Sequence, residues 1–222
     1  MSESGVVKVF QAMSPAQLRK VARELAPYLL RGGFATAASA PSSGLANPPS
    51  DWGLMAGLIA ETFPRQQQSG DSGALLVSGQ LFLSAIYIGA GRLVSVIGFT
   101  SAGTPLVVGT SPHLWYAIYD KNLNLLGQTP DHGGAGWGIY TYQVYNLAAP
   151  ILTGYSGIFY VGLMIAQTGG SLPSLCVAAS DTNALTRPPA LTGASTAGLG
   201  AVAPAVAAPL IGDYRFLFGT VA

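Results

Sequence analysis

The residues in this sequence that most resemble a catalytic motif are the Gly-Asp-Ser-Gly string at positions 70–73. This string surrounds the nucleophilic serine of trypsin-like proteases, in which an aspartate-held histidine acts as the base. In those proteases the histidine and the aspartate come before the serine in the chain. Here both histidines, His113 and His132, follow Ser72, and the string lies in a polar stretch of Gln, Ser and Gly. The pattern favours a spacer over a catalytic serine.

A second candidate is the pair Asp131-His132, which precedes a glycine-rich loop. A metal site needs three or four converging ligands, but the chain has two histidines, one cysteine and scattered carboxylates without an HxH, HExxH or CxxC motif. Asp131 follows Pro130 and is explained as a turn residue. Asp120 and Asp131 bracket a predicted hairpin and should lie near its opposite ends, which argues against a catalytic carboxylate pair. We therefore expect no metal, no cofactor and no enzymatic activity.

Aromatic side chains on a sheet are the remaining candidates for chemistry, because a sugar ring can stack on an aromatic face. Trp137, Tyr140 and Tyr142 lie close together in the sequence and are candidate glycan contacts if they face outward. The same side chains could fill a hydrophobic core instead. The sequence leaves both possibilities open.

The composition points to an unusual surface. Only 9% of the 222 residues are charged, against about 25% in ordinary domains, whereas 50% are hydrophobic and the net charge is +1. This charge balance would not steer the chain to nucleic acid, and the apolar runs are too short and too often interrupted for membrane insertion. We infer that copies of the chain or a larger assembly cover much of its surface. The alternative is a neutral monomer whose surface is rich in Ser, Thr, Asn and Gly.

Residues 1–34 are expected to form an arm and a helix that begins at Ser14-Pro15, a helix-start signal. Apolar residues then recur at helical spacing from Leu18 to Leu25. The candidate anchor residues are the basic side chains of this segment, Arg19, Lys20, Arg23 and Arg31. They either dock on an acidic partner or form a solvated helix face.

Residues 35–74 are expected to be a linker with a short helix from Asp51 through Ala60. The first 80 residues hold 11 of the 19 charged residues, so we place the main boundary near Leu75. From there to residue 222, short apolar runs alternate with Gly, Pro and Ser clusters, which indicates many strands. The predicted strands cover residues 80–88, 92–100, 106–108, 114–119, 123–128, 138–147, 158–167, 174–179 and 214–218.

We therefore predict a mainly β fold, an antiparallel, jelly-roll-like β-sandwich with a short helical N-terminal anchor segment. In the hairpin at 114–131, strand periodicity places Leu114, Tyr116 and Ile118 on one face and Trp115, Ala117 and Tyr119 on the other. Residues 188–212 contain no charge. We expect them to lie extended along the sandwich or along a neighbouring subunit.

Five short motifs follow the predicted boundary: Tyr119-Asp120 at a turn, the short return strand Leu125–Gln128, Thr129-Pro130-Asp131, the downstream Trp137, and the strand Gly157–Val161. Together they resemble a β-sandwich module found in virion proteins of tailed phages, in particular minor tail, fibre and related surface proteins of phages that infect actinobacteria. The resemblance covers roughly residues 75–179 and excludes the first 74 residues. Its motifs are structural and carry no catalytic group.

The resemblance implies a non-enzymatic virion protein, assembled in the host cytoplasm as a homotrimer and attached to other virion proteins through its N-terminal segment. A minor tail or tail-fibre protein that touches host cell-surface glycan is favoured by the module's usual context. A capsid decoration or head-fibre protein that stabilises the shell is favoured by the short chain and by the anchoring amino terminus. A carbohydrate-binding module is the third hypothesis, motivated by Trp137, Tyr140 and Tyr142.

Overall fold

The structure, a computed structural model, describes residues 57–63, 69–179, 190–211 and 215–222. The predicted N-terminal arm and helix, residues 1–34, lie outside the described residues. Within the described ranges the chain forms β-strands joined by turns and has no helix. The strands are β1 (Ala60–Glu61), β2 (Ser69–Leu75), β3 (Gln80–Ile88), β4 (Leu93–Thr100), β5 (Thr110–Tyr119), β6 (Leu125–Gln128), β7 (Tyr142–Leu152), β8 (Gly157–Thr168), β9 (Ser174–Ala179), β10 (Thr192–Ala194), β11 (Arg215–Leu217) and β12 (Gly219–Val221).

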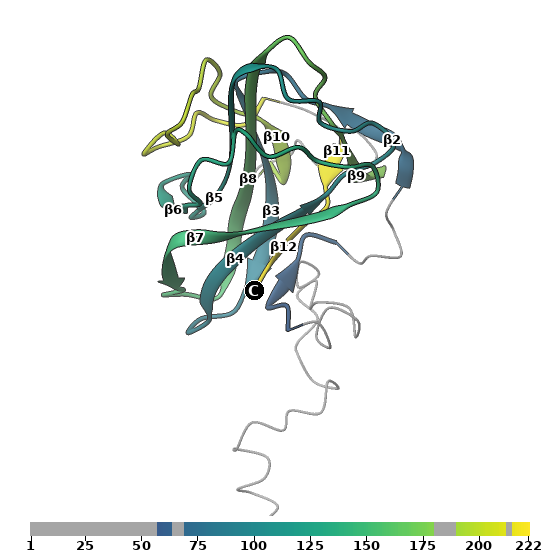
Figure 1. The fold of residues 1–222 in the computed structure, drawn as a ribbon. Helices are drawn as coiled ribbons and strands as arrows, with labels where there is room; N and C mark the ends of the chain where they lie inside the picture. Colours follow the sequence, from purple (N-terminus) through teal and green to yellow (C-terminus); the bar gives the residue numbers. More distant parts are fainter. Residues whose placement is uncertain (1–56, 64–68, 180–189, 212–214) are drawn as a thin grey trace, which may run out of the picture. The chain divides into compact units, whose positions relative to one another are not determined.

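The strands form three sheets in which every pairing between them is antiparallel (Figure 1). A five-stranded sheet has the order β10-β3-β8-β5-β6, a four-stranded sheet the order β1-β12-β4-β7, and a three-stranded sheet the order β11-β9-β2. No helix among the described residues is long and apolar enough to cross a membrane. The prediction of a mainly β, antiparallel fold is confirmed.

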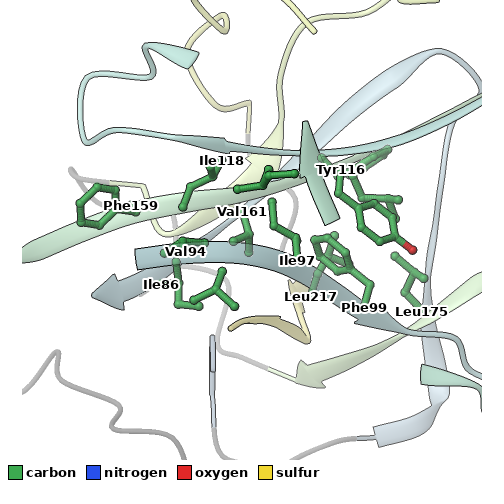
Figure 2. Packing of buried hydrophobic residues seen from close by; sticks show 14 of the residues in the cluster. Ile86, Val94, Ile97, Phe99, Tyr116, Ile118, Phe159, Val161, Leu175 and Leu217 are labelled. Atoms are coloured by element: carbon green, nitrogen blue, oxygen red, sulfur yellow. The ribbon is translucent and has the colours of Figure 1, made fainter. Parts of the chain in front are cut away.

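The main hydrophobic core joins one face of the five-stranded sheet to residues of the other two sheets (Figure 2). From β5 it receives Tyr116 and Ile118, and from β8 Phe159 and Val161. These side chains alternate along their strands because successive residues of a strand point to opposite faces. They pack against residues of the facing sheets, among them Ile97, Phe99, Leu175 and Leu217.

The opposite face of the five-stranded sheet is also buried. Its side chains include Trp115 and Tyr119 of β5 and Tyr160 and Met164 of β8. The two-sided assignment predicted for the hairpin at 114–119 is therefore confirmed. Burial on both faces explains why β3, β5 and β8 contain nearly continuous apolar sequence instead of an apolar–polar alternation.

Residues 190–211, which we call the covering segment, bury this second face. The indole N–H of Trp115 donates to the carbonyl oxygen of Gly200 over 2.7 Å, and the hydroxyl of Tyr160 donates to that of Ala190 over 2.8 Å. Ala203 and Ala207 are buried in the same cluster. The sequence left open whether this stretch packs on its own sandwich or on a neighbour. Its described part lies on the chain's own sheet.

The covering segment also reaches both edges of the five-stranded sheet. At one edge β10 pairs with β3. At the other, the N–H of Leu125 in β6 donates to the carbonyl of Ala205, and the N–H of Ala207 donates to that of Leu123. Two mutual backbone hydrogen bonds between Ala194 and Ile211 then return the segment to β10. A single stretch without charge therefore protects both edges and one face of this sheet.

Two expectations about residues 35–74 are wrong where the structure describes them. The helix expected through Ala60 is replaced over residues 57–63 by turns and β1, because Ala60 and Glu61 pair with Val221 and Thr220 of β12. Part of the expected linker is β2, which pairs with β9 and places sheet residues before the boundary predicted near Leu75. Both errors have one cause: strand partners that are 99 or more residues away override the local sequence pattern.

The later strands lie close to their predicted positions. β3 and β9 have the predicted bounds, whereas β7 begins at Tyr142 instead of residue 138. The delay follows from Tyr140, whose φ of 49° is left-handed and incompatible with an extended strand. Residues 106–108 contribute only isolated bridges, and the expected last strand is β11 followed by β12.

Candidate functional site

Asp131 fastens the loop after the hairpin to β5. Its Oδ1 accepts the N–H groups of Leu114 and Gly133 over 2.9 and 3.0 Å, and its Oδ2 lies 2.6 Å from Nδ1 of His113. Burial by itself would raise the pKa of Asp131, but these hydrogen bonds and the adjacent imidazole lower it below its usual value. Both carboxylate oxygens are engaged, so the group serves as a turn anchor.

Asp120 has the same role at the other end of the hairpin. Its Oδ1 accepts the N–H groups of Asn122 and Asn124, and its Oδ2 accepts the side-chain amide of Asn124. Burial opposes ionisation here too, yet the hydrogen bonds and nearby Lys121 give a net lowering of the pKa. Asp120 lies six positions after Leu114, which Asp131 contacts, and six steps along an extended strand span about 20 Å. The prediction that the two carboxylates are turn residues near opposite ends is confirmed.

The histidines do not complete a hydrolytic site among the described side chains. His113 is paired with Asp131, while the ring of His132 stacks on Tyr145 with centroids 3.7 Å apart. The backbone of the Gly-Asp-Ser-Gly string forms part of β2, and the side chain of Ser72 lies outside the described side chains. Across the residues that the structure describes, no three His, Cys, Asp or Glu side chains come together in a metal-binding group.

The three aromatic residues proposed as glycan contacts divide into two kinds. Trp137 is only 2% exposed, packs against Tyr116 and donates its indole N–H to the carbonyl of Thr141. Trp137 is thus a core residue, because its ring face is closed to a ligand. Tyr140 and Tyr142 are 62% and 43% exposed. The candidate anchor residues, Arg19, Lys20, Arg23 and Arg31, lie outside the described residues.

Sequence reasoning missed a surface pocket of about 440 Å³ near the Asp120 turn. The ammonium of Lys121 lies 5.7 Å from the ring centroid of Tyr155, whose ring stacks on Phe159 with centroids 4.5 Å apart. The hydroxyl of Tyr155 accepts the N–H of Lys121 and donates to the carbonyl of Ile158. The lining residues are Lys121, Asn122, Tyr155, Ser156, Gly157, Ile158 and Tyr160. The pocket thus combines apolar walls with an ammonium and an amide.

The pocket was missed because its two halves are more than 30 residues apart in the sequence. Each half carries a weak local signal. Lys121-Asn122 occupies the tip of a turn, and Tyr155-Ser156 lies between Gly154 and Gly157. A lysine at a turn and a tyrosine between glycines are both common on solvated loops, so neither indicates a site without its partner.

The described surface is poor in charge. The described residues include seven charged ones: Glu61, Asp71, Arg92, Asp120, Lys121, Asp131 and Arg215. Large apolar side chains are exposed in their place, for example Leu152, Val202 and Ile211. The one cysteine, Cys176, is buried, burial raises its pKa, and its Sγ lies 3.3 Å from the carbonyl oxygen of Ser101. A buried thiol of raised pKa is poorly suited to nucleophilic chemistry.

No protein-family model matches the chain, and no curated protein matches its sequence.

Proposed function

We propose that the chain is a non-enzymatic structural protein of a tailed-phage virion, of the minor tail or tail-fibre type. In this proposal the N-terminal segment, with Arg19, Lys20, Arg23 and Arg31, attaches the protein to other virion proteins. The sheets form a jelly-roll-like sandwich that faces the host surface. The protein assembles in the host cytoplasm as a homotrimer and resides in the virion.

The observation that carries this proposal is the neutral, apolar surface of the described domain. Seven charged residues among those described are few for a protein that moves freely in solution, where mixed charges maintain solubility. Exposed Leu152, Val202 and Ile211 add apolar area. A surface of this kind is expected where neighbouring subunits cover it, because burying apolar area stabilises assembly.

The residues behind the family resemblance give further support, because each of them maintains the fold. Asp120 and Asp131 hold turns through their carboxylate oxygens, and Trp137 fills the core beside Tyr116. Val161 lies in the main core. Motifs of this kind suit a module that is reused as a building block, and they give no reason to propose a catalytic role.

Immunogold labelling of purified phage particles tests the proposal. Antibodies raised against residues 57–222 should decorate the tail in electron micrographs, with gold absent from particles treated with pre-immune serum. Labelling of the head surface would favour the alternative of a capsid decoration or head-fibre protein. Particles that carry no label, together with absence of the protein from disrupted virions, would contradict both placements.

The pocket beside Tyr155 supports a second candidate function, carbohydrate binding. A sugar needs an apolar surface for its C–H face and polar groups for its hydroxyls, and the pocket walls with Lys121 and Asn122 offer both. Titration with host cell-wall glycan fragments should show binding that Tyr155→Ala weakens. Val107→Ala, which changes an exposed side chain outside the pocket lining, is the matched control. Binding lost equally in both variants, or absent from the unaltered protein, would contradict this function.

A further inference from the structure

Three loops are held together by hydrogen bonds around the pocket beside Tyr155. We call them the loop end: residues 89–92, 120–124 and 153–157. The N–H of Lys121 donates to the hydroxyl of Tyr155 over 3.0 Å and so joins the second loop to the third. The N–H of Ala90 donates to Oγ of Ser156 over 2.8 Å and joins the first loop to the third. The pocket is thus built on a fixed arrangement of loops that are far apart in the sequence.

The polar side chains of the pocket are rich in hydrogen-bond donors. The ammonium of Lys121 and the side-chain amide of Asn122 line it, and neither has a hydrogen-bond partner among the residues that the structure describes. Ser156 also lines the pocket, and because its Oγ accepts the N–H of Ala90, its own proton is left for a ligand. The lining contains no carboxylate. Donors grouped around a positive charge are the complement of an anionic group.

The ring of Tyr155 is already used by the protein. It stacks on Phe159 with centroids 4.5 Å apart, and the ammonium of Lys121 lies over it, 5.7 Å from the centroid. The negative face of an aromatic ring attracts a cation in this position. A sugar that stacked flat on Tyr155 would have to displace the ammonium. Tyr155 therefore positions Lys121 at the pocket, and this favours recognition through charge over recognition through stacking.

The charges of the loop end point the same way. It contains two cations, Arg92 and Lys121, against one carboxylate, Asp120, which gives a net charge of +1. The oxygens of Asp120 accept three N–H groups from residues 122 and 124 of its own turn, and Asp120 does not line the pocket. Two of the three lysines and arginines among the described residues thus lie at the loop end. A local excess of positive charge raises the concentration of anions near it.

We propose that the pocket binds an acidic saccharide, a sugar whose ring carries a carboxylate. Lys121 and Asn122 donate to the carboxylate, Ser156 donates to a hydroxyl of the sugar, and the side chain of Ile158 contacts the C–H groups of the ring. The volume of about 440 Å³ is within the usual range of small-molecule sites. The inference rests on the carbohydrate-binding function proposed for this pocket and names the class of its ligand.

Isothermal titration calorimetry of the full chain, with trigalacturonic acid and with its methyl ester, tests the inference. The two ligands have the same rings and differ in the charge of the carboxylates. We expect the acid to bind about fivefold more tightly than the ester, as for a charge pair at a partly exposed site. Raising the NaCl concentration from about 20 to about 500 mM should weaken binding of the acid alone, because salt screens such pairs.

Lys121→Gln is the variant that assigns the charge to the pocket. It keeps a polar side chain without the ammonium, so the acid and the ester should bind to it equally. Lys121→Arg should keep the preference for the acid. The double variant Lys121→Gln/Val107→Lys restores the net charge at an exposed position and should not restore the preference. Val107 precedes β5 and Lys121 follows it, and the 10 residues of β5 extend over about 30 Å.

The outcomes separate the ligand class from the binding function. Equal affinity for acid and ester in the unaltered protein would overturn the inference and leave carbohydrate binding standing. Binding of neither ligand would overturn both. A preference for the acid that survives in Lys121→Gln, with an unchanged urea midpoint, would place the charged site elsewhere and overturn the assignment to this pocket. Acetate has the carboxylate without the sugar and should compete weakly; competition as strong as that of the trisaccharide would overturn the saccharide as the ligand.

Discussion

The five-stranded and four-stranded sheets are made of similar residues but differ in how far the rest of the described chain covers their faces and edges. Both faces and both edges of the five-stranded sheet are covered, with Trp115 bonded to Gly200 on its outer face. In the four-stranded sheet, β7 is an edge strand among the described residues and carries exposed side chains such as Val144. The contrast is one of coverage: the rest of the chain covers one sheet, and the other keeps apolar side chains exposed.

The covering segment is central to this contrast, because it uses small residues to create burial. Ala203 and Ala207 face the aromatic rings of the sheet, while Val202 and Val206 beside them are exposed. An extended chain whose inward residues are small can lie close to a sheet, so it buries large aromatic rings with few atoms of its own. On β7, by contrast, Val144 is 44% exposed.

Trp115→Ala should have the largest effect and would show whether the outer face of the five-stranded sheet carries stability. It removes a fully buried indole and its hydrogen bond to Gly200. We expect the free energy of unfolding to fall by about 3–5 kcal/mol, measured by urea titration. Val144→Ala, in the four-stranded sheet, should change the free energy of unfolding by less than about 1 kcal/mol. Equal losses of unfolding free energy in the two variants would contradict the proposed difference between the two sheets.

Ala207→Asp tests the covering segment itself. The new carboxylate would be buried against the second core without a charged partner, so we expect a loss of roughly 2–4 kcal/mol in urea titrations. Limited proteolysis should then cut within residues 198–211. Val206→Asp is the matched control, because Val206 points outward, and it should stay within about 0.5 kcal/mol of the unaltered protein. Two equally stable variants would mean that the segment is loosely held.

Thr129→Val tests the link between the hairpin and its following loop. The hydroxyl of Thr129 accepts the N–H of Tyr116 over 3.0 Å at a buried position, so its loss leaves a buried donor unpaired. The expected destabilisation is about 1–3 kcal/mol, again from the urea midpoint. Thr141→Val removes an exposed hydroxyl that donates to the carbonyl of Ile139 and should cost less than about 1 kcal/mol. The reverse order would contradict the assignment of stability to the hairpin.

Sequence reasoning predicted strands well where the signal is local. β3 and β9 contain apolar runs bounded by turn residues, and their bounds agree with the structure. The alternation of Tyr116 and Trp115 predicted two faces of β5, and both proved to be buried. Periodicity could not show that a second core covers the Trp115 face. That core depends on residues about 85 positions later in the chain.

The failures lie where partners are distant or where a residue type has two uses. β1 and β2 have weak local patterns and exist through their pairings with β12 and β9. Trp137 could have been a binding or a core residue, and only its contact with Tyr116 decides for the core. Asp120 was interpretable from sequence because a turn aspartate bonds to its own neighbours.

The smallest predicted effect is on the stability of the fold at acid pH. Asp131 allows the contribution of the hairpin to be compared with that of the rest of the fold. The pKa of Asp131 is lower in the folded chain than its ordinary value of about 3.9 in an unfolded one. The unfolded state therefore binds a proton more readily. The resulting stabilisation is present above about pH 4 and is lost as the pH falls through the lower folded value.

Asp131→Asn should flatten this acid dependence, because the amide oxygen can still accept the N–H groups of Leu114 and Gly133 but does not ionise. Urea unfolding measured from pH 2 to pH 7 should show a smaller fall below pH 4 in the variant than in the unaltered protein. Asp120→Asn should act in the same direction, since the pKa of Asp120 is also lowered. If the double variant keeps the full acid dependence, carboxylates outside the hairpin must cause it, and the predicted contribution of the hairpin is wrong.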